Sequence, residues 1–323
     1  MMRRMTETGG MGAGVHAVKI TGKMPVLRKE VIMGSAKELT RRDIMRFGAG
    51  VVAAAGAARL GQGTAFAAGA KKAPIGLQLY SVRGEAQKDL AGVIAQVAEM
   101  GYEGVEFAGY YNWPAEKIRK LLDQHNLKCC GTHTAVTTLL GDEFAKTVEF
   151  NKTIGNKNLI APGIPGNMQP TNRQAWVLFA KLMTELAGKA KEQGMRVGYH
   201  NHAGEFDGKD GFIPWEVFAG NSGKDVILQV DIGHVARAGA DPAVYMEKFP
   251  GRLTTVHVKD FAKGKPDPVV GEGEVDWPTM FRICEGTGGT EWYIIEDEST
   301  SQPMQRVKTD IQNLRKLLAK YHA

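Results

Sequence analysis

Short apolar runs alternate with segments of helical spacing from residue 68 to the end of the chain. The apolar runs are rich in Val, Ile and Leu and show little polar alternation, which is typical of strands buried on both faces of a parallel sheet. The predicted strands are Ile75–Ser81, Gly104–Ala108, Lys128–Thr134, Asn158–Pro162, Arg196–His202, Val226–Asp231, Leu253–Lys259 and Trp292–Glu296. The predicted helices are clearest at Leu90–Met100, Ala115–His125, Asp142–Ile154, Arg173–Gln193 and Gln305–Tyr321.

Eight strands that alternate with helices predict an α/β fold with a single parallel (β/α)8 TIM barrel over residues 68–323. An open doubly wound sheet is the alternative. Such a sheet would favour a G-x-G-x-x-G turn after the first strand, whereas this chain has Gln-Leu-Tyr-Ser-Val-Arg at residues 78–83. The pattern therefore favours the closed barrel.

Residues 1–67 form a separate region with the features of an export signal. Residues 40–46 read Thr-Arg-Arg-Asp-Ile-Met-Arg, a weakly apolar stretch follows at 47–58, and residues 65–67 have the small-x-small form of a cleavage site. The apolar stretch is short for a bilayer core of about 30 Å, so we expect no stable membrane anchor. We predict a cleavable signal peptide, export by the twin-arginine machinery, and a periplasmic or secreted protein.

The net charge of +6 comes from this leading region. Residues 1–67 hold 11 of the 41 Lys and Arg but only 4 of the 35 acidic residues, which leaves 30 basic against 31 acidic residues in the predicted domain. A near-neutral domain lacks the basic surface of a nucleic-acid binder. We therefore expect no nucleic-acid partner.

Histidines and carboxylates gather at the carboxyl ends of the last four predicted strands, where a (β/α)8 barrel builds its active site. Charged groups buried together are costly unless they are paired or bind a metal. Without a thiolate, the set suits one divalent ion such as Mn, Co, Zn or Mg. The candidate group on these strands comprises His200, His202, Glu205, Asp231, His234, His257 and Glu296, and His133 ends the third strand.

Such an ion would acidify a C–H bond between a carbonyl and a neighbouring hydroxyl group, and a nearby base would remove the proton. Four residues are predicted to serve this chemistry. His200 or His202 is a candidate base because imidazole titrates near neutrality. His234 is a candidate to polarise a substrate oxygen, and Lys259 shares the cavity face of its strand with a predicted ligand.

Other strand ends and loops would supply the substrate contacts. Aromatic side chains can stack on the apolar faces of sugars, and polar side chains at the rim can bind hydroxyl groups. Packing within the barrel is the alternative role for each. The predicted contacts are Gln78, Tyr80, Arg83, Glu106, His133 and Trp277.

The chain from Ile75 to about Leu318 resembles the xylose-isomerase-like superfamily, which includes the sugar phosphate isomerase/epimerase family, inosose dehydratases and one family of AP endonucleases. The resemblance rests on the order of the eight strands and on six motifs. They are Gln-Leu-Tyr-Ser-Val-Arg at 78–83, Tyr-His-Asn-His-Ala-Gly-Glu-Phe at 199–206, Asp-Ile-Gly-His at 231–234, His-Val-Lys-Asp at 257–260, the loop at 270–277 and Ile-Ile-Glu at 294–296.

In that superfamily strands five to eight supply Glu, Asp, His and Glu as metal ligands, and Asp231, His257 and Glu296 match the last three. His200 stands where the strand-five glutamate would be, and Glu205 follows five residues later. The resemblance leaves both residues as candidates for the fourth ligand.

The resemblance implies a divalent-metal-dependent isomerase or epimerase that transfers a proton through an enediolate. The glycines at 286–289 precede strand eight and so lie on the face opposite a phosphate site, and export also favours an unphosphorylated sugar or keto-sugar. A lyase or hydratase that eliminates a β-oxygen from a 3-keto-glycoside or inosose-like substrate is the alternative, and it fits the histidine-rich strand five. A non-catalytic exported sugar-binding barrel is the third hypothesis.

Overall fold

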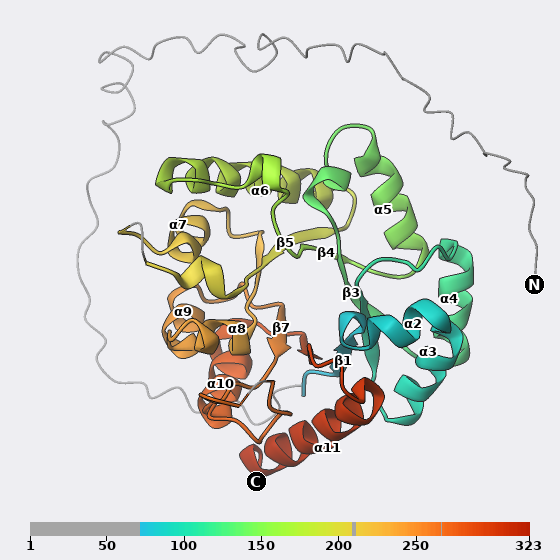
Figure 1. Ribbon diagram of the computed structural model, residues 1–323. Helices are drawn as coiled ribbons and strands as arrows, with labels where there is room; N and C mark the ends of the chain where they lie inside the picture. The colour runs from blue at the N-terminus through green and yellow to red at the C-terminus, as the bar shows by residue number, and fades with distance from the viewer. Residues whose placement is uncertain (1–71, 209–210, 266) are drawn as a thin grey trace, which may run out of the picture. The chain divides into compact units, whose positions relative to one another are not determined.

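All eight predicted strands form, and they lie parallel in one sheet of order β6-β5-β4-β3-β2-β1-β8-β7 (Figure 1). The computed structural model describes residues 72–208, 211–265 and 267–323, so the predicted signal at 1–67 lies outside the described residues. The strands are β1 (Ile75–Gln78), β2 (Gly104–Phe107), β3 (Lys128–His133), β4 (Asn158–Ala161), β5 (Arg196–His200), β6 (Ile227–Gln229), β7 (Thr255–Val258) and β8 (Trp292–Ile295).

The sheet closes between β6 and β7 through a few backbone contacts beyond the regular ladder. Leu228 N donates to Arg252 O at 2.9 Å, and His257 N donates to Val230 O at 2.9 Å. A parallel bridge also joins Asp231 to His257. The predicted (β/α)8 barrel is therefore confirmed, and its closing seam runs through two of the predicted metal ligands.

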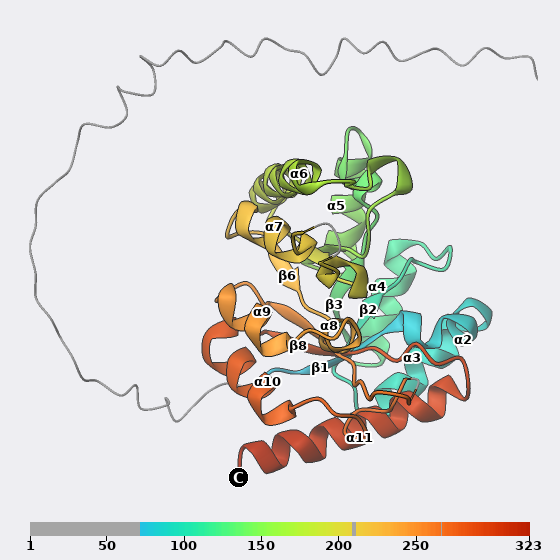
Figure 2. The same cartoon turned by 60° about the vertical axis from the view of Figure 1, so that its left-hand side comes forward.

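Helices surround the strands on all sides (Figures 1 and 2). They are α2 (Arg83–Lys88), α3 (Leu90–Glu99), α4 (Ala115–Gln124), α5 (Glu143–Thr153), α6 (Arg173–Glu192), α7 (Pro214–Asn221), α8 (Ile232–Arg237), α9 (Pro242–Lys248), α10 (Trp277–Ile283) and α11 (Pro303–Tyr321). The five helices predicted from periodicity all form. Helices α7 to α10 have six to eight residues each, which is too short for a clear helical period. None of the described helices combines the length and apolar character needed to cross a bilayer.

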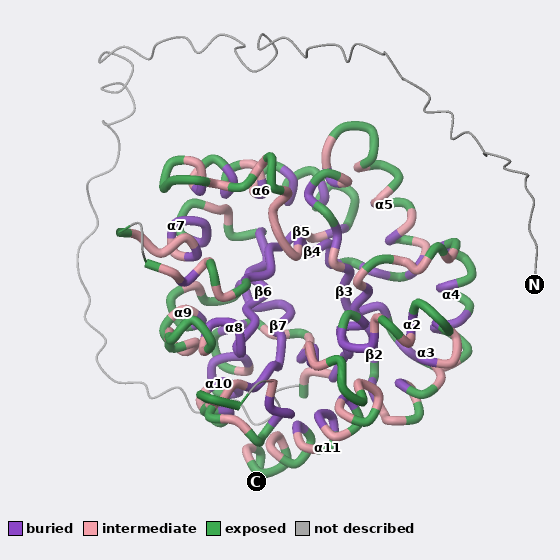
Figure 3. The backbone as a smooth tube through the Cα atoms, in the orientation of Figure 1, coloured by how far each residue is buried: buried purple, intermediate pink, exposed green. Residues whose placement is uncertain are grey.

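Apolar side chains from the strands and the surrounding helices form the core. In Figure 3 the buried residues lie mainly along the strands. Tyr199 on β5, for example, packs edge-on against Phe179 of α6 at 5.3 Å between ring centroids. The barrel interior is different, because polar side chains reach it from alternate strand positions. Gln78, Glu106, Gln229 and His257 are all fully buried there.

Candidate functional site

Asp231 directly follows β6 and caps the N-terminus of α8. Its Oδ1 accepts a hydrogen bond from His234 N at 2.8 Å, as expected of an N-cap aspartate. Asn201 holds the backbone in place, since Asn201 Oδ1 accepts from Asp231 N at 3.0 Å. Asp231 Oδ2 is buried and has no hydrogen-bond partner. One carboxylate oxygen is therefore used by the fold and the other faces the barrel interior.

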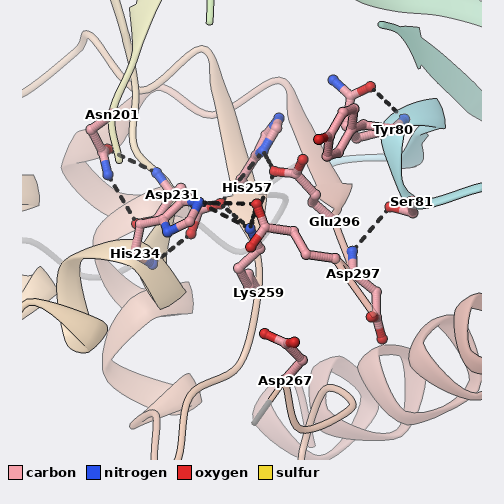
Figure 4. A network of polar contacts seen from close by, with 12 residues as sticks. Tyr80, Ser81, Asn201, Asp231, His234, His257, Lys259, Asp267, Glu296 and Asp297 are labelled. Carbon is pink, nitrogen blue, oxygen red and sulfur yellow. Dashed lines mark hydrogen bonds and ion pairs between the residues drawn. The ribbon is translucent and has the colours of Figure 1, made fainter. Parts of the chain in front are cut away.

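His257 and Glu296 come from the neighbouring strand ends of β7 and β8. His257 Nδ1 lies 2.8 Å from Glu296 Oε2 and 3.8 Å from Asp231 Oδ2. The other ring nitrogen, Nε2, lies 2.6 Å from Glu106 Oε2. Figure 4 shows Asp231, His257 and Glu296 turned toward one another.

His200, the last residue of β5, completes a four-residue cluster. It is 1% exposed, and its Nδ1 is buried without a hydrogen-bond partner. His200, Asp231, His257 and Glu296 can each offer one ligand atom, all within 4.8 Å of one another. Two imidazoles and two carboxylates suit a divalent cation. His200 Nδ1 and Asp231 Oδ2 accept no hydrogen bond within the described residues, so both atoms are open to such a cation.

Glu205 lies outside this cluster. It sits in the 3₁₀ turn η4 (Ala203–Phe206), where its Oε1 accepts from Tyr199 Oη at 2.6 Å and its Oε2 accepts from His202 N at 2.9 Å. Both oxygens therefore stabilise the turn after β5. Of the two candidates from strand five, the structure brings His200 and not Glu205 together with the other predicted ligands.

Lys259 places an ammonium group at the edge of the cluster. Its Nζ lies 3.3 Å from Asp231 Oδ2, 3.5 Å from Glu296 Oε2 and 3.3 Å from Glu298 Oε1. It also donates to His234 Nε2 at 3.1 Å. His234 Nδ1 is buried and has no hydrogen-bond partner within the described residues.

The charges of these buried groups set each other's pKa. Burial raises the pKa of Asp231, but Lys259 and His234 outweigh it and hold this pKa well below its usual value. The same balance of burial against Lys259 and His257 leaves the pKa of Glu296 well below normal. Burial would lower the pKa of Lys259, yet Asp231 and Glu296 raise it. At neutral pH these three groups are therefore two carboxylates and one ammonium.

The histidines fall into two classes. Burial lowers the pKa of His257, but Glu106 and Glu296 more than reverse this, so its pKa is well above normal. Burial, reinforced by His257 and His133, holds the pKa of His200 well below normal. His202 follows β5 and is exposed. Partial burial of its ring and the nearby His234 lower the pKa of His202. His200 and His202 are therefore neutral and can accept a proton or a cation.

The predicted substrate contacts differ in how far they are exposed. Tyr80, drawn in Figure 4, is 42% exposed, and Arg83 Cζ lies over its ring at 4.1 Å from the ring centroid. His133 is nearly buried and its Nε2 lies 3.0 Å from Gln229 Oε1. Gln78 is fully buried and donates to Glu106.

Two of the predicted substrate contacts, Glu106 and Trp277, are buried inside the fold. Glu106 is fully buried below the cluster, and polar side chains occupy both of its oxygens. Trp277 is 3% exposed at the start of α10, where its Nε1 donates to Asp260 Oδ2 at 3.1 Å and its ring stacks on Phe281. Both side chains are buried and have partners within the fold, so the substrate contacts predicted for Glu106 and Trp277 stay predictions.

Three residues of the site were not predicted. Asn201 holds the backbone of Asp231, Gln229 donates to Glu106 Oε1 at 2.8 Å, and Glu298 reaches Lys259 from the rim. Strand alternation was a usable signal for Glu298, which is two positions after Glu296. No local pattern marks Asn201 or Gln229, because their partners are distant in the sequence.

Comparison with known proteins agrees with this architecture. Residues 94–317 match the family model described as a xylose isomerase-like TIM barrel. The chain is 24% identical over 251 residues to an inosose dehydratase of Clostridium botulinum, an alignment that covers 66% of this chain and 84% of that protein.

Two solved structures are similar. A sugar phosphate isomerase/epimerase from Parabacteroides distasonis superposes with a TM-score of 0.66 and 25% identity, covering 76% of this chain and 98% of that one. The IolI protein, solved with a zinc atom, gives a TM-score of 0.61 at 14% identity, covering 77% and 99%. The second likeness extends to the fold alone.

Proposed function

Because this chain belongs to the xylose isomerase-like TIM-barrel family, we propose that it is a metal-dependent lyase acting on a keto-sugar, keto-glycoside or cyclic polyol ketone. It removes a proton next to the carbonyl and expels the oxygen substituent on the following carbon. The observation that carries this proposal is the pairing of a buried ammonium, Lys259, with the neutral imidazoles His200 and His202 at the carboxyl ends of the strands. Elimination needs one proton acceptor and one proton donor, and these groups supply both.

A divalent ion held by His200, Asp231, His257 and Glu296 would supply Lewis-acid polarisation of the substrate carbonyl. His202 lies at the mouth, 5.0 Å from His200 between ring centroids, and accepts the carbon-bound proton. Lys259 donates a proton to the departing oxygen, so the C–O bond breaks to give water or an alcohol while a C=C bond forms. The electron pair of the broken C–H bond becomes that double bond.

Lys259 regains a proton through its neighbours. His234 Nε2 is 3.1 Å from Lys259 Nζ, and Glu298 lies at the rim with 24% of its side chain exposed. These two residues link the buried ammonium to solvent. Tyr80 and Arg83 at the mouth bind the sugar ring and its hydroxyl groups.

The position of Glu205 supports elimination over a two-carboxylate epimerisation. Epimerisation at one carbon uses an acid–base group on each face of the substrate, and Glu205 is committed to Tyr199 and His202. The likeness to inosose dehydratase supports the same reaction class. We also propose an unphosphorylated substrate, because the glycines at 286–289 precede β8 and therefore lie on the face opposite a phosphate site.

An isomerase or epimerase is the second candidate, supported by the 25% identity to a sugar phosphate isomerase/epimerase. It would begin with the same proton abstraction. One experiment separates the two: the chain loaded with Mn²⁺, Co²⁺, Zn²⁺ or Mg²⁺ is incubated in D₂O with an inosose, a 3-keto-glycoside and a ketose, and products are followed by NMR. A new alkene or a released alcohol supports the lyase. Deuterium uptake without loss of oxygen supports the isomerase or epimerase, and no exchange with any of these substrates contradicts both.

Removal of the ion is the matching control. Treatment with EDTA should abolish turnover, and the divalent ion that restores it identifies the metal. Turnover that survives complete removal of divalent ions would contradict the metal-dependent mechanism.

We further propose that the chain is exported. The support is the Arg-Arg pair at 41–42 followed by an apolar stretch and a small-x-small site at 65–67. An exported enzyme would meet unphosphorylated sugars outside the cytoplasm.

A further inference from the structure

Glu106 is a fully buried carboxylate at the centre of the barrel, beneath the metal-ligand cluster. Its Oε2 accepts from Gln78 Nε2 at 2.7 Å, and its Oε1 accepts from Gln229 Nε2 at 2.8 Å. A buried charge with this many oriented donors costs less than an unpaired one, but an apolar residue would cost nothing in desolvation. Fold stability alone therefore does not explain why a carboxylate occupies this position.

The fold makes room for this side chain in two ways. The register of β2 against β3 shifts between Val105 and Glu106, and such an irregularity re-aims a side chain relative to the regular ladder. On β3, Gly131 lies against the carboxylate, and a Cβ at that position would occupy the space of Glu106 Oε1. Backbone and neighbouring side chains together thus set the direction of Glu106.

The third partner of Glu106 is the predicted ligand His257. The imidazole spans the two groups, with Nε2 at 2.6 Å from Glu106 Oε2 and Nδ1 at 2.8 Å from Glu296 Oε2. A carboxylate on one ring nitrogen keeps the proton there and directs the lone pair of the other nitrogen outward. Here that other nitrogen faces Glu296 and Asp231.

We propose that Glu106 is the positioning residue of the metal site: it holds the proton of His257 on Nε2 and thereby presents Nδ1 to the ion. The inference rests on the proposed metal-dependent function. Gln78 and Gln229 make the arrangement rigid because each binds the carboxylate from a different strand. Such carboxylate partners of histidine ligands typically change metal affinity by about 10- to 100-fold.

The test measures Co²⁺ affinity of the full chain by competition with a chromophoric chelator. Glu106→Gln keeps the shape and removes the charge, and it should weaken Co²⁺ binding about 10- to 100-fold. Asp310→Asn is the matched control, since it makes the same change in another buried carboxylate that contacts none of the proposed ligands. Its affinity should equal that of the unchanged chain.

Gly131→Ala tests the same idea without touching the charge. The added Cβ should displace the Glu106 carboxylate from His257 and weaken Co²⁺ binding, as Glu106→Gln should. This variant therefore tests the role of Glu106 even if Glu106→Gln does not fold. A ¹⁵N NMR spectrum of the metal-loaded protein reports on the His257 ring proton directly. General destabilisation of the fold would not change this one signal selectively. The Nε2–H signal of His257 should be protected from exchange in the unchanged chain and lose that protection in Glu106→Gln.

Equal Co²⁺ affinity in the unchanged chain and in a folded Glu106→Gln variant would overturn the inference and leave the proposed metal site standing. If Glu106→Gln does not fold, unchanged affinity in Gly131→Ala overturns it instead. If the unchanged chain binds no divalent ion, the proposed metal-dependent function fails, and the role of Glu106 fails with it.

Discussion

Lys259 Nζ lies 3.3 Å from Asp231 Oδ2, and both side chains are buried at the closing seam of the barrel. The ammonium offsets part of the negative charge that gathers at the ends of β6 and β8. Its Nζ also lies 3.1 Å from His234 Nε2. This contact keeps an ammonium group beside the candidate cation ligands, because Asp231 and Glu296 raise the pKa of Lys259.

Replacement of Lys259 by Met should lower kcat about 10²- to 10⁴-fold, because it removes the proposed general acid. Divalent-ion affinity should stay the same or rise, since a competing positive charge is lost. Steady-state kinetics and a metal titration check both. Lys265→Met, a half-exposed lysine paired with Glu272, is the matched control. An unchanged kcat in Lys259→Met would remove Lys259 from the mechanism.

Asp231→Asn should abolish ion binding and turnover while the barrel still folds. The asparagine Oδ1 can still accept from His234 N, so the N-cap of α8 is retained. The matched control is Asp241→Asn, since Asp241 caps α9 in the same way through Ala243 N and is exposed. Metal content by mass spectrometry and circular dichroism give the result, and wild-type metal content in Asp231→Asn would contradict the ligand assignment.

A pair of variants identifies the fourth ligand. His200→Ala should weaken metal binding, because His200 lies in the cluster with an unpaired nitrogen. Glu205→Gln should keep metal binding and lose only about 0.5–1.5 kcal/mol of unfolding free energy from its bonds to Tyr199 and His202. Calorimetric titration and urea unfolding measure the two effects. The reverse outcome would assign the ligand to Glu205.

Asp310 should make the stability of the barrel depend on pH. Burial and the adjacent Asp297 raise its pKa from 3.8 to about 7. The folded state therefore binds a proton more tightly than the unfolded state, so this group stabilises fully below about pH 4 and loses that contribution as pH rises to about 7.

Asp310→Asn should remove this dependence. The difference in unfolding free energy between the unchanged chain and Asp310→Asn should shift by up to about 4 kcal/mol between pH 4 and pH 8. Urea unfolding at both pH values, without divalent ions, measures it. A difference that does not vary with pH would mean that Asp310 titrates normally in the folded state.

Replacement of Arg41 and Arg42 by Lys should leave the uncleaved chain in the cytoplasm, because the twin-arginine pair is the predicted recognition element. Cell fractionation and immunoblotting follow the precursor and the mature form. Lys71 and Lys72 lie beyond the predicted cleavage site and serve as the control pair, whose change to Arg should not affect export. Normal export of the Arg41 and Arg42 variant would point to another signal.

The strands and the long helices could be read from the sequence because their signals are local. A buried parallel strand needs an uninterrupted apolar run, and a long helix repeats its apolar face several times. The short helices α8 and α9 lack that repetition. The cap of α8, Asp231, becomes recognisable only once β6 is in place.

By itself, the sequence determined the barrel and the convergence of Asp231, His257 and Glu296, because parallel strands bring their carboxyl ends to one face and alternate side chains point inward. Only the tertiary structure decided that His200 joins them while Glu205 turns to Tyr199. It also decided that Glu106 lies beneath His257, 151 positions away in the chain. The physical reason is the same for both: a polar side chain points to its hydrogen-bond partners, and these partners come from distant strands.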